Sequence, residues 1–263
     1  MIDQWRGKWA LITGASAGIG VALARLLAEG GTNLVLTARR RDRLQSLAAE
    51  LTKSHGIQIE TITADLERLE TPSEIYSYTS GKGIEIDLLI NNAGFGHYGW
   101  FYESPLEPQL GMVRVNCAAV VNLTHLYLLP MVQRRRGDIL ILASTASFQA
   151  VPFISVYAAT KAFDLLFAEG LAEEVKRYGV RVCALCPGST TTEFHQVAGQ
   201  PEHLKRRQET AEKVARVGLE ALAAGKSYVI SGFANYANAH AQRLVPRRLV
   251  TRVAAKMFDP EAK

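Results

Sequence analysis

Tyr157 and Lys161 are the pair of side chains in this sequence best suited to chemistry. They fall in a segment whose pattern predicts a helix from about 156 to 178, ended by Gly179. Residues four apart share one face of a helix, so the phenol and the ammonium should be neighbours. A nearby cation lowers the pKa of a phenol from its usual value of ~10. Such a phenol could give or take a proton near neutral pH, as carbonyl–alcohol chemistry requires.

The same spacing occurs a second time, in Tyr78 and Lys82. That pair spans Gly81 and abuts Gly83, and glycines at these places disfavour a helix and predict a solvated loop. The spacing alone is therefore not specific. Whether Tyr157 is functional depends on the elements that would position it.

A glycine-rich loop lies near the amino terminus. A short apolar strand over 8–13 runs into Gly14, Gly18 and Gly20, and an amphipathic helix follows over 21–29. This order suits a dinucleotide, because glycines let the backbone approach the pyrophosphate and the helix start offers free N–H groups. The spacing is G-x-x-x-G-x-G rather than the commoner G-x-G-x-x-G, and a plain strand–helix turn is the alternative.

The end of the second predicted strand, over 33–38, bears on the choice of cofactor. An acidic residue there would bind the 2′-hydroxyl of NAD, whereas an arginine would accept the 2′-phosphate of NADP. Here Arg39 comes first, and the next carboxylate, Asp42, is expected to cap a helix over 43–53. The pattern favours NADP(H); the alternative is that the arginines line an exposed helix start.

Strands and helices alternate through the rest of the chain, with further apolar strands over 58–63, 87–90, 137–143 and 180–186. This alternation predicts an α/β, doubly wound, mainly parallel sheet. Ligands bind outside the carboxyl ends of such strands, so Gly14, Arg39, Asp65 and Asn92 should converge there. Asn116 falls inside the apolar part of a long helix over 107–136, where an amide is costly unless it is bonded or functional.

Composition limits the classes of protein to consider. The chain has 263 residues, 48% hydrophobic and 21% charged, without a repeat or linker, so we expect one soluble domain over 1–263. We find no signal peptide pattern and no stretch near the ~20 apolar residues of a spanning helix. Three cysteines indicate free thiols in a reducing compartment, and we expect a cytoplasmic protein.

Two further classes of site are disfavoured. Cys183 and Cys186 should point to opposite faces of a strand, which argues against a redox or zinc pair, and no metal is expected. The net charge is +5, but the basic runs at 39–41, 134–136, 205–207 and 247–248 are scattered and not interleaved with aromatic residues. We therefore expect no nucleic-acid partner.

Taken together, these motifs resemble the short-chain dehydrogenase/reductase family in its shorter, single-domain form. The resemblance spans about residues 5–195, and the motifs appear in the family's order. The matching pieces are Thr13-Gly14-x-x-x-Gly18-Ile19-Gly20, Asp65-Leu66, Asn91-Asn92-Ala93-Gly94, Asn116, Ser144, Tyr157-x-x-x-Lys161 and Pro187-Gly188. The resemblance implies a Rossmann-type fold with a seven-stranded sheet and helices on both faces.

The resemblance also implies a role for each site residue. Tyr157 would be the general acid for carbonyl reduction, and Lys161 would lower its pKa and bind the nicotinamide ribose. Ser144 would orient the substrate carbonyl, and Asn116 would hold a water that continues the proton relay. The implied cofactor-binding residues are Gly14, Ser16, Gly18, Ile19, Gly20, Arg39, Asp65, Leu66, Asn92, Tyr157, Lys161, Pro187, Gly188, Thr190 and Thr192.

Beyond about residue 195 the match to the family's commoner members ends. We expect a substrate lid over 194–225 and a helical extension over 233–258, broken near Pro246. The basic, amphipathic extension could suit an anionic membrane surface, but a cover over the substrate cleft or a subunit contact is favoured. Expected pocket walls are Phe95, Tyr98, Phe148, Val151, Pro152 and Phe153, which suggest an apolar or aromatic carbonyl compound.

The favoured function is an NADPH-dependent reductase of a ketone, aldehyde or 3-oxoacyl compound. A non-catalytic NADP(H)-binding regulator is the main alternative, although Asn116, Ser144, Tyr157 and Lys161 together argue against it. A sugar-nucleotide epimerase is a third, for which the chain is short. The apolar faces of the Asn116 and Tyr157 helices predict a homodimer or homotetramer, as the family resemblance also implies.

Overall fold

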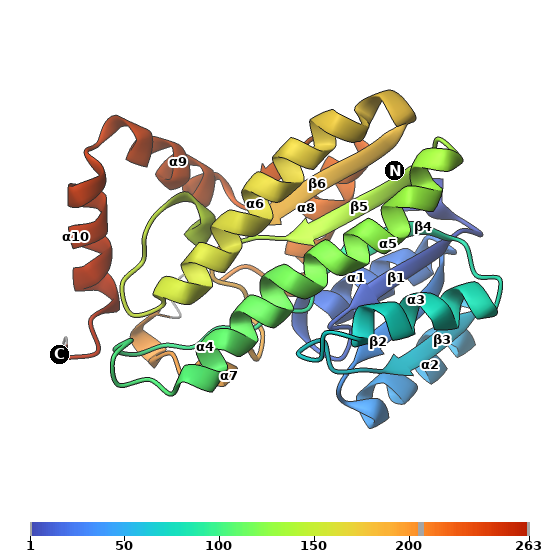
Figure 1. The fold of residues 1–263 in the computed structure, drawn as a ribbon, viewed down its shortest axis with the longest axis horizontal. Helices are drawn as coiled ribbons and strands as arrows, with labels where there is room; N and C mark the ends of the chain where they lie inside the picture. Colours follow the sequence, from blue (N-terminus) through green and yellow to red (C-terminus); the bar gives the residue numbers. More distant parts are fainter. Residues whose placement is uncertain (1, 205–207, 262–263) are drawn as a thin grey trace.

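The computed structural model describes residues 2–204 and 208–261, and its strands form a seven-stranded sheet (Figure 1). The strand order is β3-β2-β1-β4-β5-β6-β7, and every neighbouring pair is parallel. The strands are β1 (Trp9–Thr13), β2 (Asn33–Ala38), β3 (Ile59–Thr63), β4 (Ile86–Asn91), β5 (Gly137–Leu142), β6 (Val180–Cys186) and β7 (Tyr228–Ile230). The predicted doubly wound fold is confirmed, and the strand order reverses between β1 and β4, where such sheets bind ligands.

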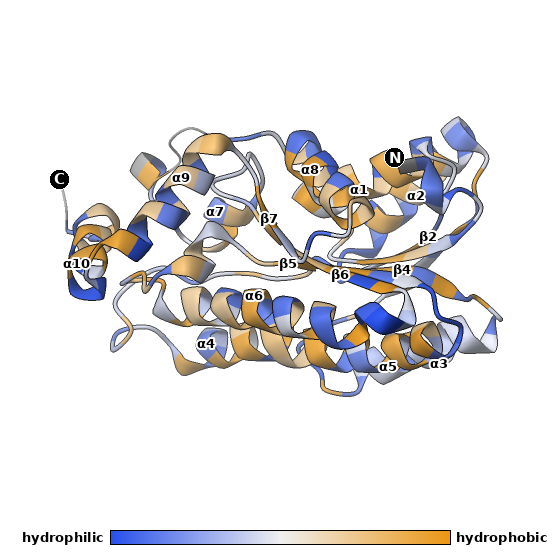
Figure 2. Cartoon of the chain, turned by 90° about the horizontal axis from the view of Figure 1, so that it is seen from above, coloured by the Kyte–Doolittle hydropathy of each residue, from blue (hydrophilic) through white to orange (hydrophobic). Residues whose placement is uncertain are grey.

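Helices cover both faces of the sheet (Figure 2). One face carries α1 (Gly18–Glu29), α2 (Arg41–His55) and α8 (Ala211–Ala223); the other carries α3 (Thr71–Gly81), α4 (Leu106–Val113), α5 (Ala119–Gln133) and α6 (Ser155–Val175). Each face has its own buried apolar core, so the strands are apolar on both sides. Cys183 lies in one core and Cys186 in the other, which confirms that they point to opposite faces.

Two local expectations are wrong. Tyr78 lies within α3 rather than in a solvated loop, and Lys82 follows the last residue of that helix. Both side chains bind the Glu60 carboxylate, at 2.7 and 2.8 Å. These contacts hold the end of α3 in place despite the low helix propensity of Gly81. Asp42 does not cap α2, because the helix begins earlier, at Arg41, and Asp42 lies in its first turn.

The long helix predicted over 107–136 is continuous but contains one turn of π-helix, Arg114–Ala118, between α4 and α5. In the described parts of the chain, this helix, Leu106–Gln133, is the one that is long and apolar enough to span a membrane by length and composition. The expectation that no such stretch exists is therefore wrong. Soluble core helices pass the same test, and this one packs beside α3 and α6 against the sheet.

The last elements are the short α7 (Phe194–Val197), α9 (Phe233–Ala241) and α10 (Arg247–Phe258). Helices α9 and α10 extend away from the sheet, at the end of the molecule opposite the N terminus (Figure 1). The expected lid, residues 194–225, divides into two parts. Its first part, up to Leu204, lines the pocket, whereas α8 packs on the sheet and buries Val214, Leu219 and Leu222 in the core. The basic run at 205–207 lies outside the described residues.

Candidate active site

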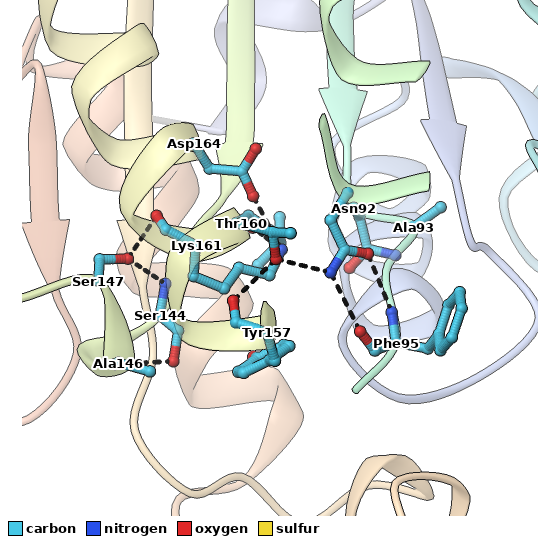
Figure 3. A network of polar contacts seen from close by, with 12 residues as sticks. Asn92, Ala93, Phe95, Ser144, Ala146, Ser147, Tyr157, Thr160, Lys161 and Asp164 are labelled. Carbon is cyan, nitrogen blue, oxygen red and sulfur yellow. Dashed lines mark hydrogen bonds and ion pairs between the residues drawn. The ribbon is translucent and has the colours of Figure 1, made fainter. Parts of the chain in front are cut away.

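The carboxyl end of β5 and the start of α6 bring Ser144, Tyr157 and Lys161 together (Figure 3). Ser144 follows β5 in an extended conformation, and its hydroxyl accepts a hydrogen bond of 3.1 Å from the Ala146 N–H. The Ser147 hydroxyl donates a 2.6 Å hydrogen bond to the Lys161 carbonyl, which links the segment after β5 to α6. The backbone around the three side chains is thus fixed by local contacts.

Lys161 is almost completely buried, with 5% of its surface exposed. Its ammonium donates to the Leu142 carbonyl at 2.6 Å and to the Asp164 carboxylate at 2.9 Å. Asp164, one helical turn further along α6, is 0% exposed. Burial disfavours the ammonium, but Asp164 and Tyr157 raise the pKa of Lys161 above its usual value, so it remains a cation.

The pKa of Tyr157 differs from the expectation. Burial raises it above the usual value, whereas the Lys161 charge and a hydrogen bond with Ser144 lower it and Asp164 raises it. The cation therefore acts in the expected direction but does not outweigh burial in the ligand-free pocket. Tyr157 is accordingly a protonated phenol that lies beside a cation.

Asn116 lies in the π turn and is fully buried. Its amide nitrogen donates to the Phe95 carbonyl and to the Thr160 hydroxyl, each at 3.0 Å, and its oxygen accepts from the Phe95 N–H at 3.2 Å. These bonds satisfy the buried amide and join the loop after β4 to α6. π turns are frequent at functional sites; that Asn116 holds a water stays a prediction.

The glycine loop after β1 forms a close backbone cradle. Gly14 and Gly18 have φ angles of +67° and +55°, which disfavour any side chain. A Cβ atom on Gly20 would lie 2.4 Å from the Gly14 carbonyl oxygen. Asn92 closes the other side, because its amide donates to the Thr13 carbonyl at 2.7 Å. The cradle fits a dinucleotide pyrophosphate, which needs close backbone approach at the start of a helix.

Basic side chains gather beside this cradle, at the end of β2. Arg40 donates to the Ser16 hydroxyl at 3.2 Å, and Arg40 and Arg43 each bind the Glu193 carboxylate at 2.7 Å. The two arginines hold the pKa of Glu193 below its usual value. Arg39 is 63% exposed and lies 3.5 Å from Glu67, a loose contact that leaves its guanidinium available.

One cavity of about 490 Å³ joins the arginines to Tyr157. It contacts nearly every residue that the sequence predicted to bind the cofactor or to act in catalysis: Gly14, Ser16, Gly18, Ile19, Arg39, Asp65, Leu66, Asn92, Ser144, Tyr157, Lys161, Pro187, Gly188, Thr190 and Thr192. Gly20 and Asn116 lie just behind this wall and support it. Within the described residues, no cluster of three or more His, Cys, Asp or Glu side chains could hold a metal ion.

Most of the expected substrate walls are wrong. Phe95 lines the cavity, but Phe148 packs against Tyr228, and Phe153 packs against Trp100. The apolar walls come instead from Ile154, which no sequence pattern indicated, and from two predicted covers of the cleft. The expected lid contributes Phe194, Val197 and Leu204, and the end of the extension contributes Phe258. Tyr98 acts indirectly, because its hydroxyl donates to the Phe258 carbonyl at 2.8 Å and holds the end of α10 beside the cavity.

Two charged residues of the site were missed. Glu193 could not have been found, since its contact with Arg40 joins positions 153 apart. Asp164 left a signal, because a carboxylate three residues after Lys161 interrupts an apolar stretch of the same helix. Spacing of three places both side chains on one face.

The comparison with known families decides the classification. Residues 8–203 match the family model for short chain dehydrogenases. The chain belongs to the short-chain dehydrogenase/reductase family. The resemblance inferred from the motifs is thereby confirmed, and the family match ends within the expected lid, close to the point at which the sequence pattern changed.

Relatives and solved structures agree with this membership. A very-long-chain 3-oxoacyl-CoA reductase of Phaeosphaeria nodorum is 34% identical over 196 residues, 73% of this chain and 58% of the relative. Mouse 17-beta-hydroxysteroid dehydrogenase type 3 is 34% identical over 188 residues, 71% of this chain and 61% of the relative. The chain thus spans about three fifths of the length of these curated short-chain dehydrogenase relatives.

Two solved dehydrogenase structures extend the likeness past residue 203. A Sphingobium yanoikuyae enzyme in complex with NADPH is 30% identical with a TM-score of 0.83, covering 92% of this chain and 94% of that one. A 7β-hydroxysteroid dehydrogenase is 25% identical with a TM-score of 0.87, covering 97% and 99%. The extension after β7 therefore has a structural counterpart in this hydroxysteroid dehydrogenase.

Proposed function

We propose that this protein is an NADPH-dependent oxidoreductase that reduces the carbonyl of a bulky, apolar ketone or 3-oxoacyl compound to an alcohol. The observation that carries the proposal is the cavity with Arg39 and Arg40 at one end and Ser144, Tyr157 and Lys161 at the other. The glycine cradle lies along the same cavity. A non-catalytic NADP(H)-binding protein would have no need of a buried cation beside a phenol.

The chain's own residues account for the proton chemistry. The bound nicotinamide supplies the hydride. Tyr157, protonated in this pocket, donates a proton to the carbonyl oxygen, and Ser144 donates a hydrogen bond to the same oxygen. Lys161 stabilises the phenolate that remains and lies where it can bind a ribose hydroxyl. Asn116 holds the loop at Phe95 against α6 and so fixes the cavity wall beside Lys161.

Charge and the names of relatives favour NADPH and a bulky substrate. No carboxylate stands at the end of β2 itself, where it would bind a ribose 2′-hydroxyl and repel a 2′-phosphate. Glu67 and Glu193 approach the arginines from other segments, and a structural neighbour is in complex with NADPH. The relatives named above act on very-long-chain 3-oxoacyl-CoA and on 17-beta-hydroxysteroids. The apolar walls from Phe95 to Phe258 are compatible with an acyl chain or a steroid.

Partner and location complete the proposal. We expect a homodimer or homotetramer, since apolar side chains of α5 and α6 are exposed. A cytoplasmic location is proposed from the three cysteines, which are free thiols. The extension has the pattern of a cleft cover, because Phe258 of α10 lines the cavity. Contact with an anionic membrane surface is the less favoured alternative for its basic outer face.

The test follows NADPH absorbance with long-chain 3-oxoacyl thioesters, steroid ketones, aromatic ketones and aldehydes, and with NADH as a comparison. Tyr157→Phe should lower kcat by about 10²- to 10⁴-fold, because it removes the proton donor and little else. Tyr78→Phe is the matched control, since this phenol binds Glu60 in α3 away from the cavity. Equal activity of Tyr157→Phe and the parent protein would refute the proposal.

A further inference from the structure

The buried carboxylate of Asp164 is a charged group that the mechanism above does not use. Its oxygen Oδ2 binds the Lys161 ammonium at 2.9 Å. Its other oxygen, Oδ1, is buried and has no hydrogen-bond partner among the described residues. Removing a carboxylate from water is costly when one oxygen stays unsatisfied. The position therefore retains a group that an apolar side chain could replace at lower cost in stability.

The surroundings of Asp164 explain what its charge can act on. On its own helix it faces Lys161 and, through Lys161, Tyr157, whose ring centre lies 6.0 Å from the ammonium nitrogen. From the π turn, Cys117 faces both Asp164 and Lys161, and from β6, Cys186 lies within reach of the Lys161 charge. Burial raises the pKa of both thiols, to about 11 for Cys117 and further for Cys186, so neither carries charge.

The ionisation states of three groups thus depend on one another: the Tyr157 phenol, the Lys161 cation and the Asp164 carboxylate. An isolated ammonium would stabilise the phenolate fully, but a carboxylate 2.9 Å from the same ammonium offsets that effect. Burial is also the main reason that the pKa of Asp164 rises to about 6, with Lys161 opposing the rise. The carboxylate is therefore mostly ionised at neutral pH and above, where a reductase needs its phenol protonated.

We propose that Asp164 is a positioning residue that binds the Lys161 ammonium, divides its charge with Tyr157 and so adds to the effect of burial in keeping Tyr157 a protonated donor. This inference deepens the proposed function and rests on it for its catalytic meaning. Its physical content, the dependence of Tyr157 ionisation on Asp164, can be measured in the ligand-free protein whether or not a substrate is known.

The test compares the parent protein with Asp164→Asn, which keeps the size of the side chain and removes its charge. Tyrosine labelled with ¹³C at Cζ reports each phenol by NMR during a pH titration, and Tyr157→Phe assigns the Tyr157 signal. We expect the pKa of Tyr157 to fall by about one unit in Asp164→Asn, since a like charge no longer opposes the phenolate. An unchanged or higher pKa would overturn the proposal.

Asp138→Asn is the matched control, because it too removes a buried, ion-paired carboxylate. Asp138 binds Arg181 at 2.6 and 2.8 Å at the start of β5, outside the cavity wall. This variant should lose stability and leave the pKa of Tyr157 unchanged; an equal shift in both variants would also overturn the proposal. Asp164→Ser gives the same titration if Asp164→Asn does not fold.

With an active substrate in hand, the alkaline limb of kcat/KM for reduction should move to lower pH in Asp164→Asn by the same amount. A merely structural role would lower kcat/KM evenly across pH. If no carbonyl compound is reduced by the parent protein, the proposed function fails, but the NMR titration still decides whether Asp164 controls the phenol. The two failures are therefore distinguishable.

Discussion

Arg39 is the single residue on which the cofactor preference depends most directly. Its guanidinium is more than half exposed at the end of β2 and makes one loose contact, so it is free to bind a 2′-phosphate. We expect Arg39→Ser to raise the KM for NADPH by about 10- to 100-fold, the range expected when one charge-assisted hydrogen bond is lost. The KM for NADH should change little, because NADH has no phosphate at this position.

Arg41→Ser provides the control, since Arg41 begins α2 beside the same cluster but does not line the cavity. It removes the same charge from the protein, and so it separates a specific contact from a general electrostatic effect. Equal increases in the KM for NADPH in the two variants would show that Arg39 makes no specific contact with the phosphate. A strong preference for NADH in the parent protein would show that the arginine cluster does not bind a 2′-phosphate.

Residue types were well predicted where a backbone requirement or a helix period fixes the neighbour. Gly14 and Gly18 have the positive φ angles that the loop pattern indicates, and Tyr157 and Lys161 share a face because they are one turn apart. The predicted direction of the Tyr157 pKa shift, a lowering, was wrong, because desolvation depends on everything packed around the ring. That information is tertiary and has no local pattern.

At the scale of elements, the contact between the start of α2 and the residue before α7 connects the cofactor end of the cavity to the lid. Glu193 occupies the position that a phosphate would need in order to bind Arg40 and Arg43. We expect Glu193→Gln to lower the KM for NADPH several-fold, because the amide competes less strongly for the two arginines. Steady-state kinetics with NADPH and with NADH, which should not respond, provide the measurement.

Glu60→Gln is a suitable comparison, because Glu60 also accepts from two side chains, Tyr78 and Lys82, away from the cavity. The high exposure of the Arg40, Arg43 and Glu193 side chains means that salt should weaken their contact, so the effect of Glu193→Gln should shrink at high ionic strength. A higher KM for NADPH in Glu193→Gln would instead mean that Glu193 aids binding.

Element boundaries were predictable where hydrophobic pattern and glycines agree, as in β2 and β6, whose bounds match the prediction at both ends. The π turn at Asn116 was not predictable, because one inserted residue hardly changes the spacing of apolar residues along the helix. A cover over the cleft was a favoured role of the extension, but the contact that brings α10 back to the cavity was not predictable, since Tyr98 and Phe258 are 160 positions apart. Sequence pattern places elements, but side-chain contacts between distant elements decide which of them line a pocket.

At the scale of the whole molecule, the most unusual surface is the outer face of α4, α5 and α6. Large apolar side chains there remain exposed, including Leu129 at 60% and Leu166 at 70%. Figure 2 shows these helices side by side on one face of the sheet. Exposed large apolar side chains on neighbouring helices of one face indicate an interface. The same helix pair on a second copy would cover it symmetrically, as a two-fold contact requires.

We therefore expect the parent protein to be a dimer or tetramer by light scattering coupled to size-exclusion chromatography. Leu166→Glu should shift it toward smaller species, with the dissociation constant raised at least about 100-fold, because each two-fold contact would bury two unpaired carboxylates. Leu244→Glu is the control: Leu244 is 89% exposed between α9 and α10, away from this face. If Leu244→Glu dissociates the protein and Leu166→Glu does not, the C-terminal extension forms the contact. Tyr157 would then share its pocket entrance with a second subunit, and substrate KM would depend on protein concentration.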